Sequence, residues 1–397
     1  MSHLLGYRNN DYTLFMINNF ENIEILPVNS HKELKNFVNL PAVIYRNDSV
    51  WVPPLWVSEY KEYRDKENTV LAHSDYQLLL AYSGKEVVGR VIVYIDHNFN
   101  SFYKSKTGFF GAFEAIDGSS AGTALLRAAE AWLYEKGMNT VRGPIDPVAE
   151  KWGFVVSGYS QDQIFMSPHN PPYYNDLVTA EGYFKAKDLL VYSVDMGNNY
   201  KIPERINKFS EFLIKRKPNF SVRRIDLKNI NSEAEHIWKI MNAAVSGNWG
   251  YVPIEIDEVR DLVKKLKEIV DPDAVLFVED NGVPVGCALG FPDINRIIKK
   301  NKGHMFPFGF LRFIFGLKKI RDYRLWALAV LEEYHGMGLD VLLYAELYKA
   351  LLPKKVRMEA NYILEDNVHI RNALEKLGMV QIKSYRVYEK KLLKEDI

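Results

Sequence analysis

The order of apolar and polar residues predicts an α/β fold, because alternating stretches typical of strands occur between segments with helical spacing. Residues 274–293 contain two apolar stretches joined at a glycine turn, which predicts a β-hairpin. Across the C-terminal half the predicted order is β-α-α-β-β-β-α-β-α-β. Strands are expected at 220–227, in the hairpin, and at 323–331, 356–363 and 381–390; helices are expected at 233–245, 258–269, 339–352 and 367–379, with a connecting helix within 203–219.

The hairpin pattern occurs a second time, at residues 78–96, and other features repeat at nearly the same offset. Gly182 is followed five residues later by a lysine and ten residues later by a tyrosine, and Gly378 is followed in the same way. Two copies of one fold explain such repeats. We therefore expect two domains, residues 1–200 and 201–397.

Composition and charge narrow the class of protein. The 397 residues include 51 Lys and Arg against 50 Asp and Glu, and this net charge of +1 argues against nucleic acid as a partner. The single cysteine, Cys287, excludes a disulfide framework, and the histidines lack metal-binding spacing, so we expect no metal. We expect a cytoplasmic protein, because the first twenty residues lack the apolar run of a secretory signal and no stretch resembles a membrane span.

The most informative segment is VLEEYHGMGLD, residues 330–340, between an expected strand and an expected helix. We call it the glycine loop. Gly336 and Gly338 let the backbone approach a ligand closely, and the following helix N-terminus presents unpaired N–H groups. A pyrophosphate suits such a loop, although glycines before a helix also occur in simple tight turns.

The element order, the glycine loop and the N-x(10)-G spacing from Asn367 to Gly378 resemble the GNAT acyltransferase superfamily, which binds acyl-coenzyme A (acyl-CoA). Further stretches at 108–117, 141–147, 170–174 and 306–310 are similar to an uncharacterised bacterial group of two-copy GNAT-like proteins. The resemblance implies two tandem GNAT folds, each a mixed, mostly antiparallel sheet flanked by helices.

The resemblance also implies how acetyl-CoA or another acyl-CoA binds as cosubstrate. The family loop Q/R-x-x-G-x-G/A aligns with His335, Gly336, Met337, Gly338, Leu339 and Asp340. The N–H of Val330 would stabilise the oxyanion, and Asn367 would face the pantetheine thiol. Leu374 stands where many members carry a tyrosine acid, which leaves the general acid unassigned. We expect the Asp340 carboxylate to point away from the pyrophosphate, because it would otherwise repel it.

The first copy departs from this pattern. Its corresponding loop, residues 117–122, lacks G-x-G, and Ser119 and Ser120 are interpreted there as helix caps. We expect the first copy to shape the acceptor site while the second copy binds coenzyme A. Trp51 and Trp249, each followed by a nearby proline, fall in loops that border the acceptor site in GNAT folds; packing within the turn is the alternative.

Glu359 is the candidate general base, because a charge inside a largely apolar strand needs a reason. The alternative, which we favour, is an ion pair with a neighbour such as Arg357 or Lys355.

The second copy also carries an aromatic insertion at about residues 294–322. The favoured interpretation is packing on the other domain to cover the seam between the domains. The alternatives are an apolar wall for a long acyl or acceptor group, and peripheral contact with a membrane, which is not favoured.

These patterns together predict an acyl-CoA-dependent N-acyltransferase that transfers an acyl group, acetyl in the first instance, to the amine of a small molecule or peptide. The alternative is a non-enzymatic module that binds acyl-CoA or a peptide without turnover.

Overall fold

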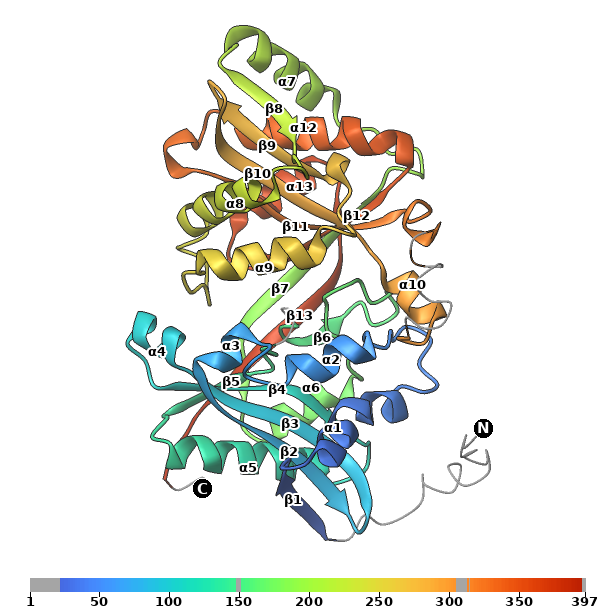
Figure 1. Cartoon of the computed structure of the whole chain (residues 1–397), viewed down its shortest axis with the longest axis vertical. Helices are drawn as coiled ribbons and strands as arrows, with labels where there is room; N and C mark the ends of the chain where they lie inside the picture. Colours follow the sequence, from blue (N-terminus) through green and yellow to red (C-terminus); the bar gives the residue numbers. More distant parts are fainter. Residues whose placement is uncertain (1–21, 148–150, 305–312, 314, 395–397) are drawn as a thin grey trace.

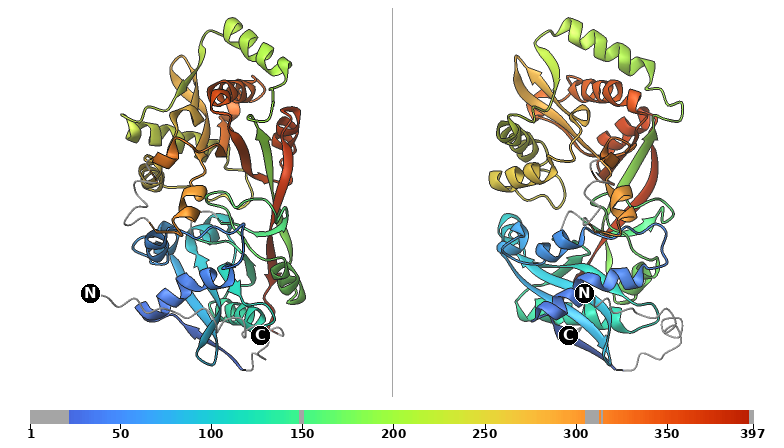
Figure 2. Two further views of the ribbon diagram at one scale, coloured as in Figure 1. Left: turned by 90° about the vertical axis from the view of Figure 1, so that its right-hand side faces the viewer. Right: turned by 45° about the vertical axis from the view of Figure 1, so that its right-hand side comes forward.

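The computed structural model of the chain describes residues 22–147, 151–304, 313 and 315–394, whose strands form one mixed sheet with helices on both faces (Figures 1 and 2). The strands are β1 (Ile23–Pro27), β2 (Ser74–Ser83), β3 (Glu86–Asp96), β4 (Thr107–Ala115), β5 (Thr140–Gly143), β6 (Phe154–Ser157), β7 (Phe184–Asp195), β8 (Phe220–Arg224), β9 (Val275–Asp280), β10 (Val283–Pro292), β11 (Asp322–Val330), β12 (Arg357–Leu364) and β13 (Val380–Lys391). The α-helices are α1 (His31–Ile44), α2 (Trp56–Glu62), α3 (Thr69–Ala72), α4 (His97–Tyr103), α5 (Ala121–Glu135), α6 (Tyr173–Ala180), α7 (Glu204–Arg216), α8 (Ile230–Ala244), α9 (Ile256–Leu266), α10 (Asn295–Lys300), α12 (Leu339–Leu351) and α13 (Val368–Lys376).

Each half of the chain contributes a run of neighbouring strands to the sheet. The first half supplies β1-β2-β3-β4-β5 and the second supplies β12-β11-β10-β9-β8. In both runs the last connection, β4 to β5 and β11 to β12, is parallel, and the other pairs are antiparallel. The predicted fold class, a mixed and mostly antiparallel sheet flanked by helices in each copy, is therefore confirmed.

The two halves exchange their last strands. Strand β7 ends the first half but pairs with β12 of the second, and β13 ends the second half but pairs with β5 of the first. The two exchanged strands also pair with each other, from Val380↔Ser193 to Glu389↔Phe184. In Figure 1 the green β7 and the red β13 run side by side between the halves. These two strands join the strands of the first half to those of the second in one sheet.

The exchanged strands are held by apolar burial and by a charged pair. Val191, Tyr385 and Val387 are almost completely buried in a cluster of their own between the halves. The Arg386 guanidinium donates to both carboxylate oxygens of Asp188, at 2.7 and 2.9 Å. Because this bidentate geometry joins β13 to β7 directly, it also fixes their register.

Helices cover both faces of the sheet in each half. In the first half, α5 buries Leu125, Ala129 and Leu133 at helical spacing against one face, and α1 covers the other. In the second half, α12 buries an almost continuous apolar surface on one face, while α8 and α9 cover the other. The two faces of each half therefore have separate hydrophobic cores.

The sequence predictions for individual elements agree with the structure to within a few residues. Both hairpins form, as β2–β3 and β9–β10, and the second turns at Asn281 and Gly282. Both turn residues have positive φ angles, of 48° and 82°, as a two-residue type I′ turn requires. The predicted connecting helix is α7.

The described part of the aromatic insertion contacts the first half. The Trp56 indole donates to the Lys302 carbonyl at 2.9 Å, and the Lys299 ammonium donates to the Ser49 carbonyl. Phe313 packs on the core beside α12. Phe315 is exposed, and three further aromatic residues of the insertion, Phe306, Phe308 and Phe310, lie outside the described residues.

A chain divided at residue 200 should reveal the strand exchange. Residues 1–200 alone would lack β13 and expose β7 without β12, so we expect this fragment to aggregate, and residues 201–397 alone to do the same. Co-expressed, the two fragments should copurify as a one-to-one complex with the circular dichroism spectrum of the intact chain. A soluble, monomeric first fragment with a cooperative melt would contradict this role of the exchanged strands.

Candidate functional site

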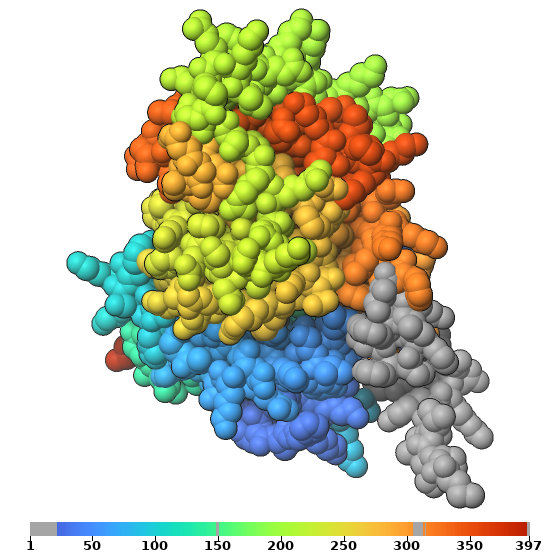
Figure 3. All heavy atoms as spheres, turned by 45° about the horizontal axis from the view of Figure 1, so that its top comes forward, coloured from blue at the N-terminus to red at the C-terminus, as the bar shows by residue number. Residues whose placement is uncertain are grey.

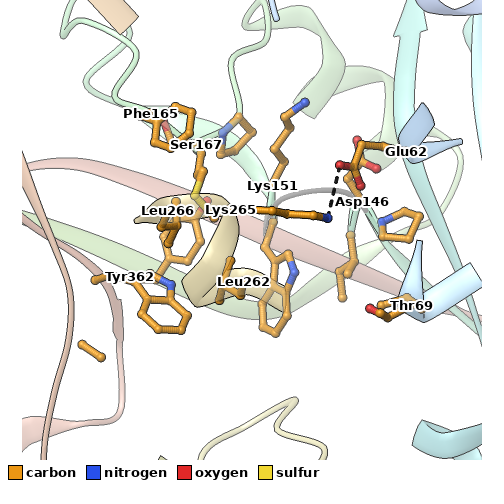
Figure 4. A pocket seen from close by; sticks show the side chains of 18 of the residues that line it. Glu62, Thr69, Asp146, Lys151, Phe165, Ser167, Leu262, Lys265, Leu266 and Tyr362 are labelled. Atoms are coloured by element: carbon orange, nitrogen blue, oxygen red, sulfur yellow. Dashed lines mark ion pairs between the residues drawn. The ribbon is translucent and has the colours of Figure 1, made fainter. Parts of the chain in front are cut away.

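A cavity of about 1210 Å³ lies between the two halves and is lined by residues from both. In Figure 3 helices α8 and α9 (yellow) lie directly on first-half segments (blue), and residues from both sides of this contact line the cavity. Figure 4 shows Glu62 and Asp146 on one side and Leu266 and Tyr362 on the other, with Lys265 reaching from α9 to within 4.0 Å of Glu62. The predicted loop residues Trp51, Pro53, Trp249 and Pro253 all line this cavity.

The second half supplies an apolar wall. Helices α8 and α9 turn the buried sides of Ile237, Met241 and Leu266 toward the cavity, and β10 and β11 add Leu289 and Leu325. The sequence predicted α9 as a helix at 258–269, with its apolar residues on one stripe. In the structure that stripe faces a space large enough for a ligand.

The first half supplies a charged wall, formed by Glu59, Arg90, Glu114, Asp146 and Lys151. The first four side chains are each less than a tenth exposed. The Lys151 ammonium lies 3.3 Å from Glu59, and an Arg90 nitrogen lies 3.8 Å from Glu114. Burial alone would lower the pKa of Lys151. The neighbouring carboxylates of Glu59 and Asp146 outweigh this effect and raise the pKa, so the Lys151 amine stays charged.

Glu114 occupies the most unusual position in this wall. The hydroxyl groups of Tyr45 and Tyr174 both donate to its Oε2, at 2.7 and 2.8 Å. Burial raises the pKa of Glu114 to about 6. Arg90 and the two tyrosine hydroxyl groups lower this pKa, but together they only partly offset the effect of burial. A carboxyl group with this pKa can gain or lose a proton near neutral pH.

The charges around the whole cavity are predominantly negative, although the protein is nearly neutral. Among the described residues, five Lys or Arg side chains line it: Lys66, Arg90, Arg142, Lys151 and Lys265. Ten acidic side chains from the same part of the chain line it: Glu59, Glu62, Asp65, Glu67, Asp96, Glu114, Asp146, Glu258, Asp261 and Glu268. Such a cavity favours a positively charged ligand.

One end of the cavity opens into a splay between β11 and β12. These parallel strands pair with each other only from Asp322↔Arg357 to Leu325↔Ala360. Both strands continue beyond this point, but there they no longer pair with each other. The cavity lining includes Leu328 from β11 and Ile363 from β12, beyond the last pair. The splay is therefore accessible from the cavity.

Strand geometry directs the N–H of Val330 toward this splay. The neighbouring Leu331 N–H donates to the Val285 carbonyl at 2.9 Å, which leaves Val330 opposite Gly286 as a non-hydrogen-bonded pair. Because N–H and C=O groups of such a residue point away from the paired strand, those of Val330 face the β12 side. On this side, the Nε2 of His335 donates to the Val330 carbonyl at 2.9 Å.

Gly336 and Gly338 of the glycine loop both have left-handed backbone conformations, with φ angles of 77° and 80°. The two glycines have different surroundings. A Cβ atom at Gly338 would lie 2.4 Å from the Phe209 ring of α7, whereas one at Gly336 would meet no atom within 4 Å. Gly338 therefore accommodates α7, and Gly336 faces open space with the exposed Met337 beside it.

The other predicted contacts of the loop have identifiable surroundings. Leu339, the first residue of α12, is buried, and Asp340 is partly buried in the first turn of that helix. Asn367 caps α13 by accepting from the N–H of Ile370 at 3.2 Å, and it also lines the cavity. The Nε2 of His335 donates to the Val330 carbonyl at the end of β11, and the role of His335 in binding phosphate stays a prediction.

Glu359 does not line the cavity. It is almost fully buried, and its Oε1 lies 3.4 Å from the Arg357 guanidinium, the ion pair considered in the sequence analysis. Burial raises the pKa of Glu359, while Arg357 and Lys383 oppose this rise. Its role as general base stays a prediction.

Two features of the site were missed in the sequence. Tyr344, on α12, lines the cavity beside the splay, and its hydroxyl forms no hydrogen bond within the described part of the chain. Burial and the nearby Asp340 raise its pKa, so this hydroxyl is protonated at neutral pH. Arg90 and Glu114 interrupt apolar strands just as Glu359 does, and that signal could have identified the charged wall.

The equivalent splay of the first half is packed with aromatic rings. Phe113 lies edge-on to Tyr174 and Phe154, with ring centroids 5.2 and 5.9 Å apart. At the start of α5, a Cβ at Gly122 would lie 2.3 Å from Leu177. Ser120 occupies the N-cap position but makes no capping bond with its side chain, so the cap interpretation is wrong for its hydroxyl.

Neither a metal site nor a bilayer-spanning helix is found in the parts of the chain that the structure describes.

Comparisons with known proteins agree with this architecture. No family model matches the chain. It is 30% identical over 368 residues to protein YghO of Escherichia coli K12, covering 91% of this chain and 93% of that protein. It is also 30% identical over 381 residues to the bacterial ceramide synthase of Caulobacter vibrioides, covering 93% and 98%.

Two solved structures share the fold. A tandem GNAT protein from the clavulanic acid biosynthesis pathway superposes with a TM-score of 0.56 at 13% identity, covering 94% of this chain and 99% of that one. A GCN5-related N-acetyltransferase from Sphaerobacter thermophilus gives a TM-score of 0.51 at 13% identity, covering 93% and 96%. With two relatives matched over nearly their whole length and a tandem GNAT fold, the chain belongs to the family of bacterial two-copy GNAT-like proteins that includes YghO and the bacterial ceramide synthase.

Proposed function

We propose that this protein is an acyl-CoA-dependent N-acyltransferase whose acceptor is an amine with a long apolar chain. The observation that carries the proposal is the continuity of the cavity, which extends from the β11–β12 splay to a charged wall on the other half. A thioester entering through the splay and an amine bound in the cavity would therefore meet in one space between the two halves.

The coenzyme end of the site is assigned to the second half. The open Gly336, the first turn of α12 and the unpaired splay suit a pyrophosphate followed by a narrow extended arm. Helix α7, which contacts this loop through Phe209, carries four basic side chains against two acidic ones: Arg205, Lys208, Lys215 and Arg216 against Glu204 and Glu211. This charge suits the polyanionic end of coenzyme A, whereas the acidic cavity suits an amine.

The apolar wall supports a long-chain acceptor. A cavity of about 1210 Å³ exceeds what a small polar amine needs. One relative bears the name ceramide synthase, and a ceramide is a long-chain amino alcohol acylated on nitrogen. The short amine or peptide acceptor expected from the resemblance is therefore replaced in this proposal by a lipid-like amine.

The chemistry follows from the groups around the splay. The neutral amine attacks the thioester carbonyl, and the inward-facing N–H of Val330 stabilises the oxyanion that forms. When the intermediate collapses, the carbon–sulfur bond breaks, the hydroxyl of Tyr344 donates a proton to the leaving thiolate, and Tyr344 recovers a proton from the newly acylated nitrogen, which leaves a neutral amide and the free thiol. Tyr344 thus takes the role that Leu374 cannot fill.

The first prediction concerns the acceptor. With acyl-CoA and a series of primary alkylamines from butyl to dodecyl, release of the coenzyme A thiol should rise with chain length, because each buried methylene contributes about 0.8 kcal/mol, or roughly fourfold in kcat/KM. A colorimetric thiol assay measures this. Tight acyl-CoA binding with no thiol release for any amine would favour the non-enzymatic alternative.

The second prediction concerns the glycine loop. Gly336→Ala places a methyl group where the ligand should lie, and we expect at least a tenfold loss of coenzyme A affinity by calorimetry. Because position 336 has a left-handed backbone conformation, the alanine should also lower the free energy of unfolding by about 1–2 kcal/mol. Gly282→Ala is the matched control, since Gly282 has a similar φ of 82° and open surroundings in a distant hairpin turn. Unchanged affinity in Gly336→Ala would remove the loop from the site.

Substitution at Gly338 is less informative, because any side chain there collides with Phe209 and would disturb the packing of α7.

The third prediction concerns Tyr344. Tyr344→Phe should lower kcat at least tenfold with little change in KM for acyl-CoA or in melting temperature, because its hydroxyl forms no hydrogen bond within the described residues. Tyr348→Phe, one turn further along α12 and outside the cavity lining, should behave like the unmodified protein. An unchanged kcat in Tyr344→Phe would exclude it as the acid.

A further inference from the structure

Basic residues are concentrated in the insertion around α10. Residues 294–321 contain eight Lys and Arg residues and neither Asp nor Glu. Because the whole chain has 51 basic and 50 acidic residues, the residues outside this segment include seven more acidic than basic side chains. All the basic residues of the segment except Arg312 belong to the described part of the chain. The insertion is therefore a strongly positive region of an otherwise acidic protein.

The two sides of α10 differ in character. The inward side is apolar, because Ile294, Ile297 and Ile298 are each less than a tenth exposed, and Ile294 and Ile298 line the cavity between the halves. On the outward side Lys300 is exposed, and Lys302 is exposed in the turn that follows the helix. Packing at the seam between the domains thus explains the inward side of the insertion and leaves its charged outward side without a role.

Some cations of the insertion have partners in the fold. Arg296 pairs with Asp322 at 3.0 Å, and the side chains of Lys299 and Arg321 donate to backbone carbonyls. Four exposed lysines form no ion pair within the described residues: Lys300, Lys302, Lys318 and Lys319. Like charges that lack counterions repel one another, and an anionic partner would remove this repulsion.

Exposed apolar side chains lie in the same region. Phe315 is 70% exposed, and the glycine after it packs so closely on α10 that a Cβ atom there would lie 2.8 Å from Ile297. Val57 of α2 is 72% exposed, and the residue before it, Trp56, donates its indole N–H to the Lys302 carbonyl at 2.9 Å. Figure 1 shows the orange α10 beside the blue α2. Apolar groups and unpaired amines are thus exposed together where α2 meets the insertion.

We propose that this region docks the protein on an anionic lipid bilayer. We call it the insertion surface, and it consists of Val57, Lys300, Lys302, Phe315, Lys318 and Lys319. The lysine amines bind lipid phosphate groups, while Phe315 and Val57 enter the boundary between the head groups and the acyl chains. The inference goes beyond the proposed acyl transfer and does not depend on it.

The mixture of side chains favours a bilayer over a nucleic acid. Cations alone suffice to bind a phosphate backbone, and an aliphatic side chain such as Val57 cannot stack on bases. At a bilayer, by contrast, both Val57 and Phe315 leave water as they enter the acyl boundary. Because Ile294 and Ile298 on the inward side of α10 line the cavity, docking also places the cavity close to the bilayer.

Flotation with lipid vesicles tests the docking. The full chain, without acyl-CoA, is mixed with vesicles of equal parts phosphatidylglycerol and phosphatidylcholine, or of phosphatidylcholine alone. We expect at least tenfold stronger partitioning to the anionic vesicles, and we expect added salt to weaken it, because ions screen the lysine charges. Failure to float with the anionic vesicles at low salt would overturn the proposal.

A double lysine variant tests whether the binding is localised. Lys318→Gln with Lys319→Gln should lower partitioning to the anionic vesicles at least tenfold, since each lysine near an anionic surface contributes roughly fivefold. Lys32→Gln with Lys35→Gln is the matched control, because these lysines of α1 are also exposed and form no ion pair within the described residues. The two double variants have the same net charge, so equal loss in both would contradict a localised surface.

Tryptophan at position 315 reports whether the side chain enters the bilayer. Brominated acyl chains quench an indole that reaches the acyl region, so Phe315→Trp should show more quenching in anionic vesicles than the unmodified protein does. Phe102→Trp is the control, since Phe102 is 47% exposed on α4, and it should show no added quenching. Equal quenching in both variants would contradict the proposal. Binding of single-stranded RNA that requires Lys318 and Lys319, without added quenching of Phe315→Trp, would assign the surface to nucleic acid and overturn it.

Discussion

The pairing of β7 with β13 is the interaction on which the rest of the structure depends. Each strand completes the sheet of the half to which it does not belong, and the Arg386–Asp188 pair joins them. This pairing holds the halves in one orientation, and that orientation brings the apolar wall of α8 and α9 opposite the charged wall of the first half. The cavity is therefore a product of the exchange, since neither half alone encloses it.

The charge distribution divides the molecule into an end suited to an anion and an end suited to a cation. Basic side chains of α7 accompany the glycine loop, whereas acidic side chains line the cavity. With a net charge of only +1, the protein has no strong overall field, and these local fields can guide two substrates to different entrances. In the proposed reaction, the two substrates would meet at the splay between β11 and β12.

The sequence was sufficient to predict what is encoded locally. Turn residues such as Asn281 and Gly282, and the helical stripe of α9, depend on neighbours in the chain, and these elements form as predicted. The exchange could not be predicted in this way, because the alternation of residues in β7 specifies a buried strand and not its partner. Glu114 gave the same signal as Glu359, a charge in an apolar strand, but only the fold shows that Glu114 lines a cavity and Glu359 does not.

The exchanged strands also constrain how this gene can evolve. After duplication, a copy without a working coenzyme loop would ordinarily be free to decay or to be deleted. Here the first copy carries β7, which the second copy needs to complete its sheet, so deletion of the first copy would disrupt both. The first copy is therefore retained for its strand, whatever the sequence of its own loop, and its cavity-facing residues can change while β7 stays constant.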